Sequence, residues 1–271
     1  MERLDQSLVT RHMVASRTAA VRHIRAGEVL VNGEIAPKAA MKITASDLVE
    51  LTVSSPQYAS RAGHKLAGAL EAFPSVQVAG ARCLDAGAST GGFTDVLLQH
   101  DAREVVAIDV GHNQIVSRLR YDPRVEVREG MNVRYLVAQD VGDPFDVVVS
   151  DLSFISLTLV LRALAGVSRL GAELLLMVKP QFEIGRAHLP KTGVVTDPYK
   201  RRQAVMNVVT HAIAEGLVPQ GLTASPLPGQ DGNKEFFLWA SKPQRHTPMP
   251  SAPDAAEWVD AQQVDWADAL D

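Results

Sequence analysis

Cysteine is almost absent from the chain, because Cys83 is the only thiol among 271 residues. An intramolecular disulfide is therefore excluded, and the cysteine usage gives no sign of an oxidising compartment. Cys83 lies inside an apolar run, where a small buried residue is a better interpretation than a nucleophile. We expect a cytoplasmic protein.

Long hydrophobic runs are also missing. The most apolar stretch, residues 173–178, is far shorter than the roughly 20 residues that a membrane-spanning helix needs. The first residues lack the charged-then-apolar layout of a signal peptide. These patterns give little support to a membrane-spanning or pore-forming role, and we expect that the protein needs no membrane.

The formal net charge of −4 hides an uneven distribution along the chain. Residues 243–271 hold six acidic side chains against Arg245 alone, whereas the first 65 residues hold nine Lys or Arg against six Asp or Glu. Proline, alanine and acids leave the tail little apolar surface to bury. We therefore expect an acidic, disordered tail over residues 243–271 and a basic region near the N-terminus.

Residues 1–52 predict a small α+β module. Ser16 is placed to cap a helix that Gly27 ends, and Asn32-Gly33 follows a short apolar strand as a tight turn. The helix carries exposed arginines, which suit phosphate contacts but also keep any surface soluble. The candidate RNA-binding residues are Arg3, Arg17, Arg22, Arg25, Lys38 and Arg61.

The same module resembles the S4 domain, a small RNA-binding fold. The resemblance rests on Arg3-Leu4-Asp5, on residues 16–20, on residues 24–33 and on Lys38. It implies binding of structured RNA and no particular chemistry. After it, the chain loses its periodicity around Ser54, Ser55 and Pro56, which predicts a linker over residues 53–60.

Residues 61–242 predict an α/β domain of Rossmann-like class. Apolar runs alternate with helical patterns, which indicates a mostly parallel sheet covered by helices. Ligands of such sheets bind at the carboxyl ends of the strands. The expected strands are residues 81–86, 104–110, 125–128, 145–150, 174–179 and 236–240.

A glycine-rich loop, residues 85–92, follows the first of these strands. Its glycines let the backbone turn sharply, and a helix starting near Gly91 points its amides at a ligand. Asp109, after the second strand, can accept hydrogen bonds from ribose hydroxyls. A dinucleotide loop reads Gly-x-Gly-x-x-Gly, which this loop does not, so S-adenosylmethionine is the favoured cofactor. The candidate cofactor-binding residues are Asp85, Gly87, Ser89, Thr90, Gly91, Gly92, Phe93, Asp109 and Asn132, the last equally well an ordinary turn residue, and no metal site is expected.

The chemical type of the group that accepts the methyl is reflected in the sequence near the active site. Amino-group methylation commonly uses Asn or Asp before Pro-Pro-aromatic, whereas here the fourth strand ends in Ser-Asp-Leu-Ser-Phe, residues 150–154. Carbon-5 methylation needs a cysteine, and Cys83 is poorly placed for it. A ribose 2′-hydroxyl is a weak acid, so its methylation calls for a cation or a lysine of low pKa beside the oxygen. The candidate catalytic residues at strand ends and near the domain's start are Lys65, Asp151, Lys179 and Glu235, although each alone fits a solvated surface side chain.

These four residues resemble the Lys-Asp-Lys-Glu tetrad of FtsJ-like RNA 2′-O-methyltransferases, which implies that the second lysine activates the hydroxyl. Residues 1–240 as a whole resemble the TlyA family, whose members are described both as haemolysins and as ribosomal RNA 2′-O-methyltransferases. The resemblance rests on the S4 string and on residues 60–66, 85–95, 150–156, 179–183 and 193–195; many relatives have Gly where Ala62 stands.

The resemblance implies 2′-O-methylation of cytidine in 16S or 23S ribosomal RNA, with ribosomal subunits as the partner. Two alternatives stay open at this point. One is a non-catalytic RNA-binding protein with a methyltransferase fold, and the other is a membrane-active haemolysin.

Overall fold

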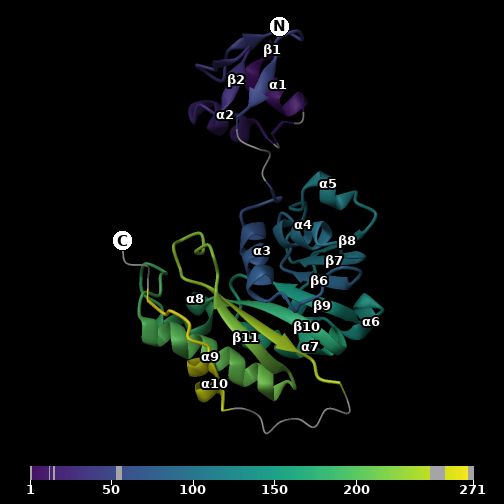
Figure 1. The fold of residues 1–271 in the computed structure, drawn as a ribbon, viewed down its shortest axis with the longest axis vertical. Coiled ribbons are helices and arrows are strands. Elements are labelled where there is room, and N and C mark those ends of the chain that lie inside the picture. The colour runs from purple at the N-terminus through teal and green to yellow at the C-terminus, as the bar shows by residue number, and fades with distance from the viewer. Residues whose placement is uncertain (1, 12, 15, 53–56, 245–253, 268–271) are drawn as a thin grey trace. The chain divides into compact units, whose positions relative to one another are not determined.

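The computed structural model describes residues 2–11, 13–14, 16–52, 57–244 and 254–267. The chain divides into two compact units, Met1–Gln57 and Tyr58–Asp271 (Figure 1). The division falls inside the predicted linker, of which residues 53–56 lie outside the described part. Each unit has a hydrophobic core of its own.

The first unit is the predicted α+β module. Ser16 Oγ accepts a hydrogen bond from the amide of Ala19 and so caps α2, and Gly27 follows that helix with φ 73°. Asn32 and Gly33 both have positive φ and form the turn between β2 and β3. The elements are β1 (Glu2–Arg3), α1 (Leu4–Thr10), α2 (Arg17–Arg25), β2 (Val29–Val31), β3 (Glu34–Ile35), β4 (Lys42–Ile43) and β5 (Val49–Leu51). Strand β1 pairs with β4, and β3, β2 and β5 form an antiparallel sheet.

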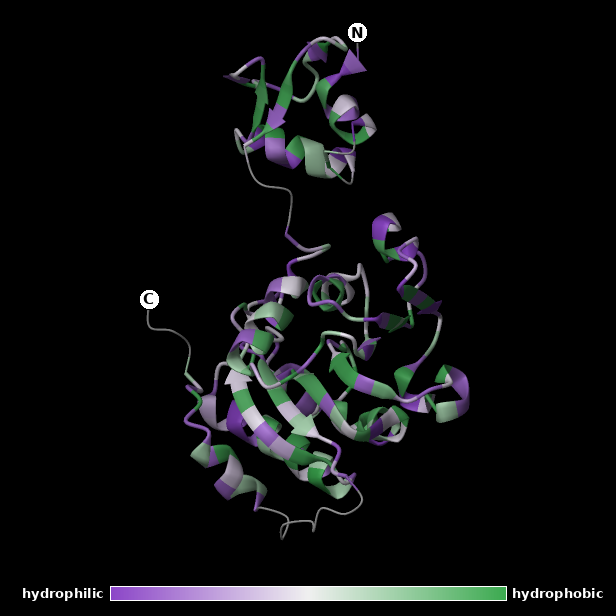
Figure 2. Ribbon diagram, turned by 45° about the vertical axis from the view of Figure 1, so that its right-hand side comes forward, coloured by the Kyte–Doolittle hydropathy of each residue, from purple (hydrophilic) through white to green (hydrophobic). Residues whose placement is uncertain are grey.

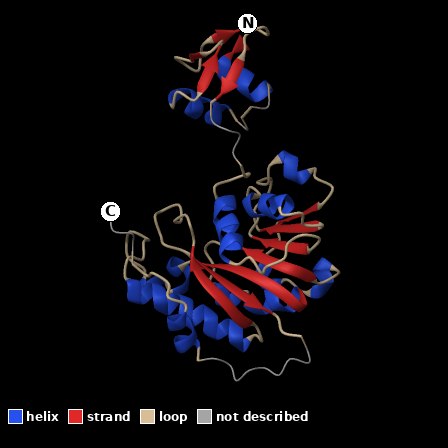
Figure 3. Cartoon of the chain, viewed as in Figure 1, coloured by secondary structure: helices blue, strands red, loops and turns tan. Residues whose placement is uncertain are grey.

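The second unit is built on a seven-stranded sheet with the order β11-β12-β10-β9-β6-β7-β8 (Figure 3). The five strands from β10 to β8 run parallel, and β12 is antiparallel to both of its neighbours. The strands are β6 (Arg82–Ala86), β7 (Glu104–Asp109), β8 (Val125–Glu129), β9 (Phe145–Ser150), β10 (Ser168–Val178), β11 (Val218–Ala224) and β12 (Phe236–Ser241). All six predicted strands are present, and the mostly parallel α/β sheet is confirmed.

Helices cover both faces of this sheet, and each face has its own core because side chains alternate along a strand. Leu84 of β6 joins the core under α7 and α9, whereas its neighbour Cys83 joins the core under α3 and α4. Hydrophobic residues gather on the strands (Figure 2). The helices are α3 (Ala62–Ala72), α4 (Gly92–Gln99), α5 (Ser117–Arg120), η1 (Val133–Tyr135), α6 (Ala138–Val141), η2 (Leu157–Leu159), α7 (Leu161–Val167), α8 (Pro180–Glu183), η3 (Arg186–His188), α9 (Pro198–Ala214) and α10 (Ala255–Ala261).

The strand order reverses beside β6. From β6 the chain continues to β7 and β8 on one side and then crosses to β9 on the other. The crevice at the carboxyl ends of β6 and β9 is therefore the topological switch point, where ligands of open α/β sheets bind.

Strand β11 was not predicted. Its sequence contains Pro219 and Gly221, which break a strand pattern, and the pairing register with β12 shifts between these two residues. Proline has no N–H to donate to a neighbouring strand. It is tolerated here because β11 is an edge strand, which has a neighbour on one side only.

The predicted disorder of the tail is wrong for residues 254–267, while residues 245–253 and 268–271 lie outside the described part. Helix α10 packs on α9 with Val259 buried, and the Trp266 ring lies tilted against the ring of Phe236, with 5.0 Å between the ring centroids. Asp260 forms a bidentate ion pair with Arg202. A few well-spaced apolar side chains and one ion pair thus anchor a segment whose average composition indicated disorder.

Candidate active site

The glycine-rich loop leaves the end of β6 in a conformation that requires glycine. Gly87 and Gly91 have φ values of 91° and 96°, which disfavour a side chain. A Cβ on Gly87 would also lie 2.8 Å from the carbonyl oxygen of Asp151. The loop can therefore approach a ligand and the neighbouring strand end at the same time.

Asp85 lies beneath this loop and is fully buried. Its Oδ2 accepts hydrogen bonds from the amide and the hydroxyl of Thr94, at 2.8 and 2.7 Å. Its Oδ1 has no hydrogen-bond partner among the residues that the structure describes. Burial raises the pKa of Asp85 to about 7, so an added cation would stabilise its charged form.

Asp109 ends β7 and shapes the loop from the other side. Its two oxygens accept the amides of Ser89 and Gly111, at 2.8 and 2.7 Å. Each carboxylate oxygen retains a lone pair for a further donor such as a ribose hydroxyl. Asn132 Oδ1 accepts the amide of Arg134, so this side chain also has the ordinary turn role that the sequence left open.

A cavity of about 780 Å³ opens over this end of the sheet. Such a volume fits a nucleoside-sized ligand. Gly87, Ser89, Asp109 and Asn132 contribute to its wall, together with apolar side chains that include Ile108, Met131, Val133 and Leu152.

The four predicted catalytic residues form two ion pairs. Lys65 Nζ lies 2.6 Å from Glu235 Oε2, and Lys179 Nζ lies 2.6 Å from Asp151 Oδ1. Lys65, Lys179 and Glu235 are buried, and Asp151 is nearly so. The acidic residue nearest to Lys65 in the sequence is Glu71, but the structure places Glu235 beside Lys65 instead.

Strand register explains why these residues meet. Ser150 of β9 pairs with Leu176 of β10, and Val178 of β10 pairs with Phe236 of β12, so Asp151, Lys179 and Glu235 occupy neighbouring strand ends. The last strand, β12, runs antiparallel to β10, and this direction brings Glu235 to the same edge.

A second, smaller cavity of about 160 Å³ joins the cofactor loop to one ion pair. Its wall includes Gly87, Gly92 and Phe93 from the loop region, and Asp151 and Lys179 from the strand ends. Thr90 and Gly91 line neither of the two cavities. Gly91 instead precedes α4 as its left-handed N-cap residue.

Several side chains that sequence reasoning missed border the same edge. Gln181 Nε2 donates to Glu235 Oε1 at 3.2 Å, and Lys179 Nζ donates to Ser153 Oγ at 2.9 Å. Phe154 is 92% exposed and lies 5.4 Å from the ring of Phe182. Their only signal in the sequence is that they follow Asp151 and Lys179 within three residues.

The predicted RNA-binding residues of the first unit include a preorganised pair. Arg3 donates to both oxygens of buried Asp5, and Arg17 Nη2 donates to Asp5 Oδ2 at 2.8 Å. The hydrogen bond from Arg3, together with that from Arg17, holds the pKa of Asp5 well below its usual range. Arg22, Arg25 and Lys38 are exposed, and Arg61 of the second unit donates to the carbonyl of Pro228.

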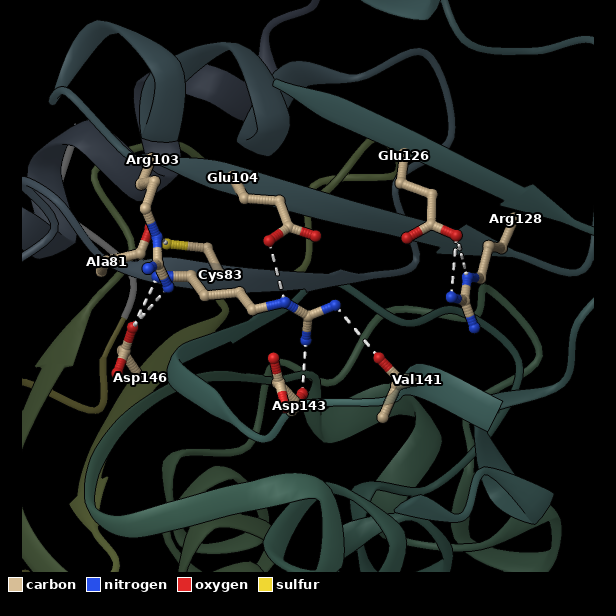
Figure 4. Close-up of polar contacts among 10 residues, drawn as sticks. Ala81, Cys83, Arg103, Glu104, Glu126, Arg128, Val141, Asp143 and Asp146 are labelled. Atoms are coloured by element: carbon tan, nitrogen blue, oxygen red, sulfur yellow. Dashed lines mark hydrogen bonds and ion pairs between the residues drawn. The ribbon is translucent and has the colours of Figure 1, made fainter. Parts of the chain in front are cut away.

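The opposite edge of the sheet is closed by ion pairs. Arg82 donates to Glu104 and to the carbonyls of Asp143 and Val141, and Arg103 faces Asp146 (Figure 4). Arg169 also pairs with Asp146, at 2.7 Å. Arg103 and Arg169, which line a cavity at this edge, thus share the carboxylate of Asp146.

Cys83 is buried, and burial raises the pKa of its thiol to about 12. It is therefore not a thiolate nucleophile at neutral pH. Among the described residues, no cluster of His, Cys, Asp and Glu is arranged to hold a metal ion. Within the same residues, no helix is long and apolar enough to span a bilayer.

Comparisons with known proteins agree with this geometry. The family model of the FtsJ-like methyltransferases matches residues 58–242, and that of the S4 domain matches residues 2–49. The chain is 49% identical to the 16S/23S rRNA (cytidine-2'-O)-methyltransferase TlyA of Mycobacterium tuberculosis, over 88% of each chain. It is 39% identical to Hemolysin A of Brachyspira hyodysenteriae, over 87% of this chain and 98% of that protein. The solved structure named "Putative hemolysin from Streptococcus thermophilus" superposes with a TM-score of 0.71 at 37% identity, covering 96% of this chain and 94% of that one.

Proposed function

The chain belongs to the FtsJ-like methyltransferases with an S4 domain, and from this premise we propose that it transfers the methyl group of S-adenosylmethionine to a ribose 2′-hydroxyl of ribosomal RNA. The observation that carries the proposal is the Lys179–Asp151 ion pair, which lines the same small cavity as the cofactor loop. The cytidine specificity and the 16S or 23S target follow the activity named for the 49% identical relative from Mycobacterium tuberculosis. Such a substrate places the protein in the cytoplasm.

The residues at this end of the sheet fit S-adenosylmethionine, although the fully buried Asp85 lies beneath the glycine-rich loop and lines neither cavity. The unpartnered, buried Oδ1 of Asp85 is an acceptor for a cationic amino group, and Asp109 can accept ribose hydroxyls. Asn132 and the apolar wall of the cavity would hold the adenine. When bound, the cofactor supplies a methyl group on a sulfonium, which is already activated for displacement.

Lys179 is the residue that handles the acceptor's proton. In the ion pair with Asp151 the Lys179 side chain is an ammonium, so it would first give one proton to solvent. The resulting amine would then accept the hydroxyl proton as the 2′-oxygen takes the methyl group that the cofactor supplies. Asp151, 2.6 Å away, stabilises the ammonium that results. Lys65 and Glu235 form a second pair at the same edge and orient the acceptor.

Two aromatic rings, one exposed and one partly buried, extend the site outward. Phe154 and Phe182 lie at the mouth of the large cavity, and Phe154 presents most of its surface to solvent. Nucleobases taken out of a helix stack on such side chains. This surface would hold the base of the nucleotide whose ribose is methylated.

The proposal is tested with ribosomal subunits that lack the modification. The full-length protein and labelled S-adenosylmethionine should yield one 2′-O-methylated nucleotide per target site, which mass spectrometry of nuclease fragments locates. Absence of transfer to subunits, with intact RNA binding, would identify a non-catalytic RNA-binding protein. Dye leakage from liposomes that survives Asp85→Ala would instead favour the haemolysin interpretation.

The arginine pair of the first unit makes a separate prediction. Asp5→Asn should weaken binding to ribosomal RNA by about three- to tenfold, because Arg3 and Arg17 lose the carboxylate that aligns them for phosphates. Net charge alone predicts the opposite result, tighter binding, because Asp5→Asn removes one negative charge from the protein. Glu50→Gln, an exposed acid of the same unit, makes the same change of charge without touching an arginine and should not weaken binding. Titrations of the full-length proteins with labelled RNA decide, and tighter binding by Asp5→Asn would contradict the alignment.

A further inference from the structure

The loops that follow β9 and β10 contact each other residue by residue. The contacts run in the same order along both segments: Asp151 with Lys179, Ser153 with Lys179, Phe154 with Phe182, and Ser156 and Leu157 with Glu183. The first contacts belong to the active site described above. The last one lies at the far end of the series and has no part in the chemistry proposed for the site.

Glu183 makes this last contact with both of its oxygens. Oε2 accepts the hydroxyl of Ser156 at 2.5 Å, and Oε1 accepts the amide of Leu157 at 2.8 Å. Burial raises the pKa of Glu183, so the carboxylate is held in a poorly solvated place by these donors. Glu183 thereby provides the hydrogen-bond acceptor for the first amide of η2, that of Leu157.

The segment that Glu183 anchors also packs Leu152, Ile155 and Leu157 on the core, but its central residue has no such support. Phe154 at its centre is almost fully exposed and has a positive φ of 64°, which is strained for an aromatic residue. Such a conformation persists only where the surroundings over-determine it. On one side the segment is fixed by Lys179, and on the other by Glu183.

We propose that Glu183 is a positioning residue for methyl transfer: it clamps the segment 151–157 against the 179–183 turn and so sets the place of Asp151 and Phe154 beside Lys179. This inference rests on the proposed function for its catalytic consequence. Its structural part, the clamp itself, stands on the contacts alone.

The test compares three variants of the full-length protein. Glu183→Ala should lower kcat on unmodified ribosomal subunits by about 10- to 100-fold, the cost of a small misplacement at a reacting centre. Glu183→Gln should recover to within about threefold, because its amide can accept from Leu157 and donate to Ser156. Glu173→Ala is the matched control. Glu173 is a half-buried glutamate in the middle of β10, with a pKa that burial raises and one short hydrogen bond, from Trp239. It should lose thermal stability and keep kcat.

Hydrogen exchange measured by mass spectrometry provides the second readout. Amides of residues 151–160 should exchange faster in Glu183→Ala, and Glu183→Gln and Glu173→Ala should match the wild type there. Wild-type kcat in Glu183→Ala, or a Gln variant as slow as the Ala variant, would overturn the inference.

If the wild type methylates nothing, the proposed function fails, and exchange alone decides the clamp: unchanged exchange in Glu183→Ala overturns it. If Glu183→Ala does not fold, Ser156→Ala removes one of the two contacts and should lower kcat by about threefold or more. Unaltered kcat in that variant would count against the clamp.

Discussion

Replacement of Lys179 by alanine is expected to lower the rate of methyl transfer by about 10²- to 10⁴-fold, the contribution typical of a positioned acid or base. The variant removes the amine that takes the hydroxyl proton and leaves the carboxylate of Asp151 unpaired at the edge of the small cavity. The measurement is the initial rate of tritium transfer from labelled S-adenosylmethionine to unmodified ribosomal subunits, with both substrates saturating.

Two further variants separate the loss of proton transfer from the loss of a positive charge and from a general loss of stability. Lys179→Arg keeps the cation but cannot take up a proton, so it should remain nearly as slow as the alanine variant. Lys242→Ala removes a partly buried lysine at the opposite edge of the sheet, whose Nζ donates to the carbonyls of Ala165 and Ser168, and it should keep the wild-type rate. Equal labelling by the wild type and Lys179→Ala would refute the role of Lys179.

The affinity for S-adenosylmethionine is expected to rise with pH between pH 5.5 and 7.5, by about tenfold in total. Burial raises the pKa of Asp85 to about 7, so below that pH the carboxyl of the free protein is protonated. Because the cationic amino group of the cofactor binds the ionised form, binding must release a proton at low pH, and this cost disappears as the pH rises through 7. Isothermal calorimetry in buffers of different ionisation enthalpy measures both the affinity and the released proton.

Asp85→Asn is the control for this pH dependence. The amide keeps an acceptor for Thr94 but carries no titrating charge, so binding should be weaker by about tenfold or more and nearly independent of pH in this range. A wild-type affinity that stays flat from pH 5.5 to 7.5 would show that Asp85 does not meet the charge of the cofactor.

The strands that carry the site could be predicted because their signals are local. The apolar run 81–86 contains Asp85 next to its last residue, and the run 145–150 is followed by Asp151. Parallel strands bring such residues to one edge. Strand β11 escaped prediction because Pro219 and Gly221 interrupt its pattern, and only its edge position makes them harmless. Helix α10 was not predicted because average composition does not show that Val259 and Trp266 pack on the core.

The partners of the predicted site residues could not be predicted. Lys65 has Glu71 close by in sequence, yet its partner is Glu235, 170 positions away. Glu183 and Gln181 gave no signal of their own, because an isolated Glu or Gln after a strand fits a solvated surface equally well. Their hydrogen-bond partners are Ser156, Leu157 and Glu235, which lie close to them only in the folded domain.

The sequence by itself determined the two modules and the glycine-rich loop, since these depend on short-range rules of backbone conformation, capping and side-chain periodicity. It also predicted the four residues of the tetrad, through their places near strand ends and the family resemblance. Only the tertiary structure decided that the tetrad forms two ion pairs, that Asp85 keeps an unpartnered oxygen and a raised pKa, and that Glu183 joins two loops. The physical reason is that pairing and burial depend on which distant segments exclude water together, and strand register across the sheet sets those neighbours.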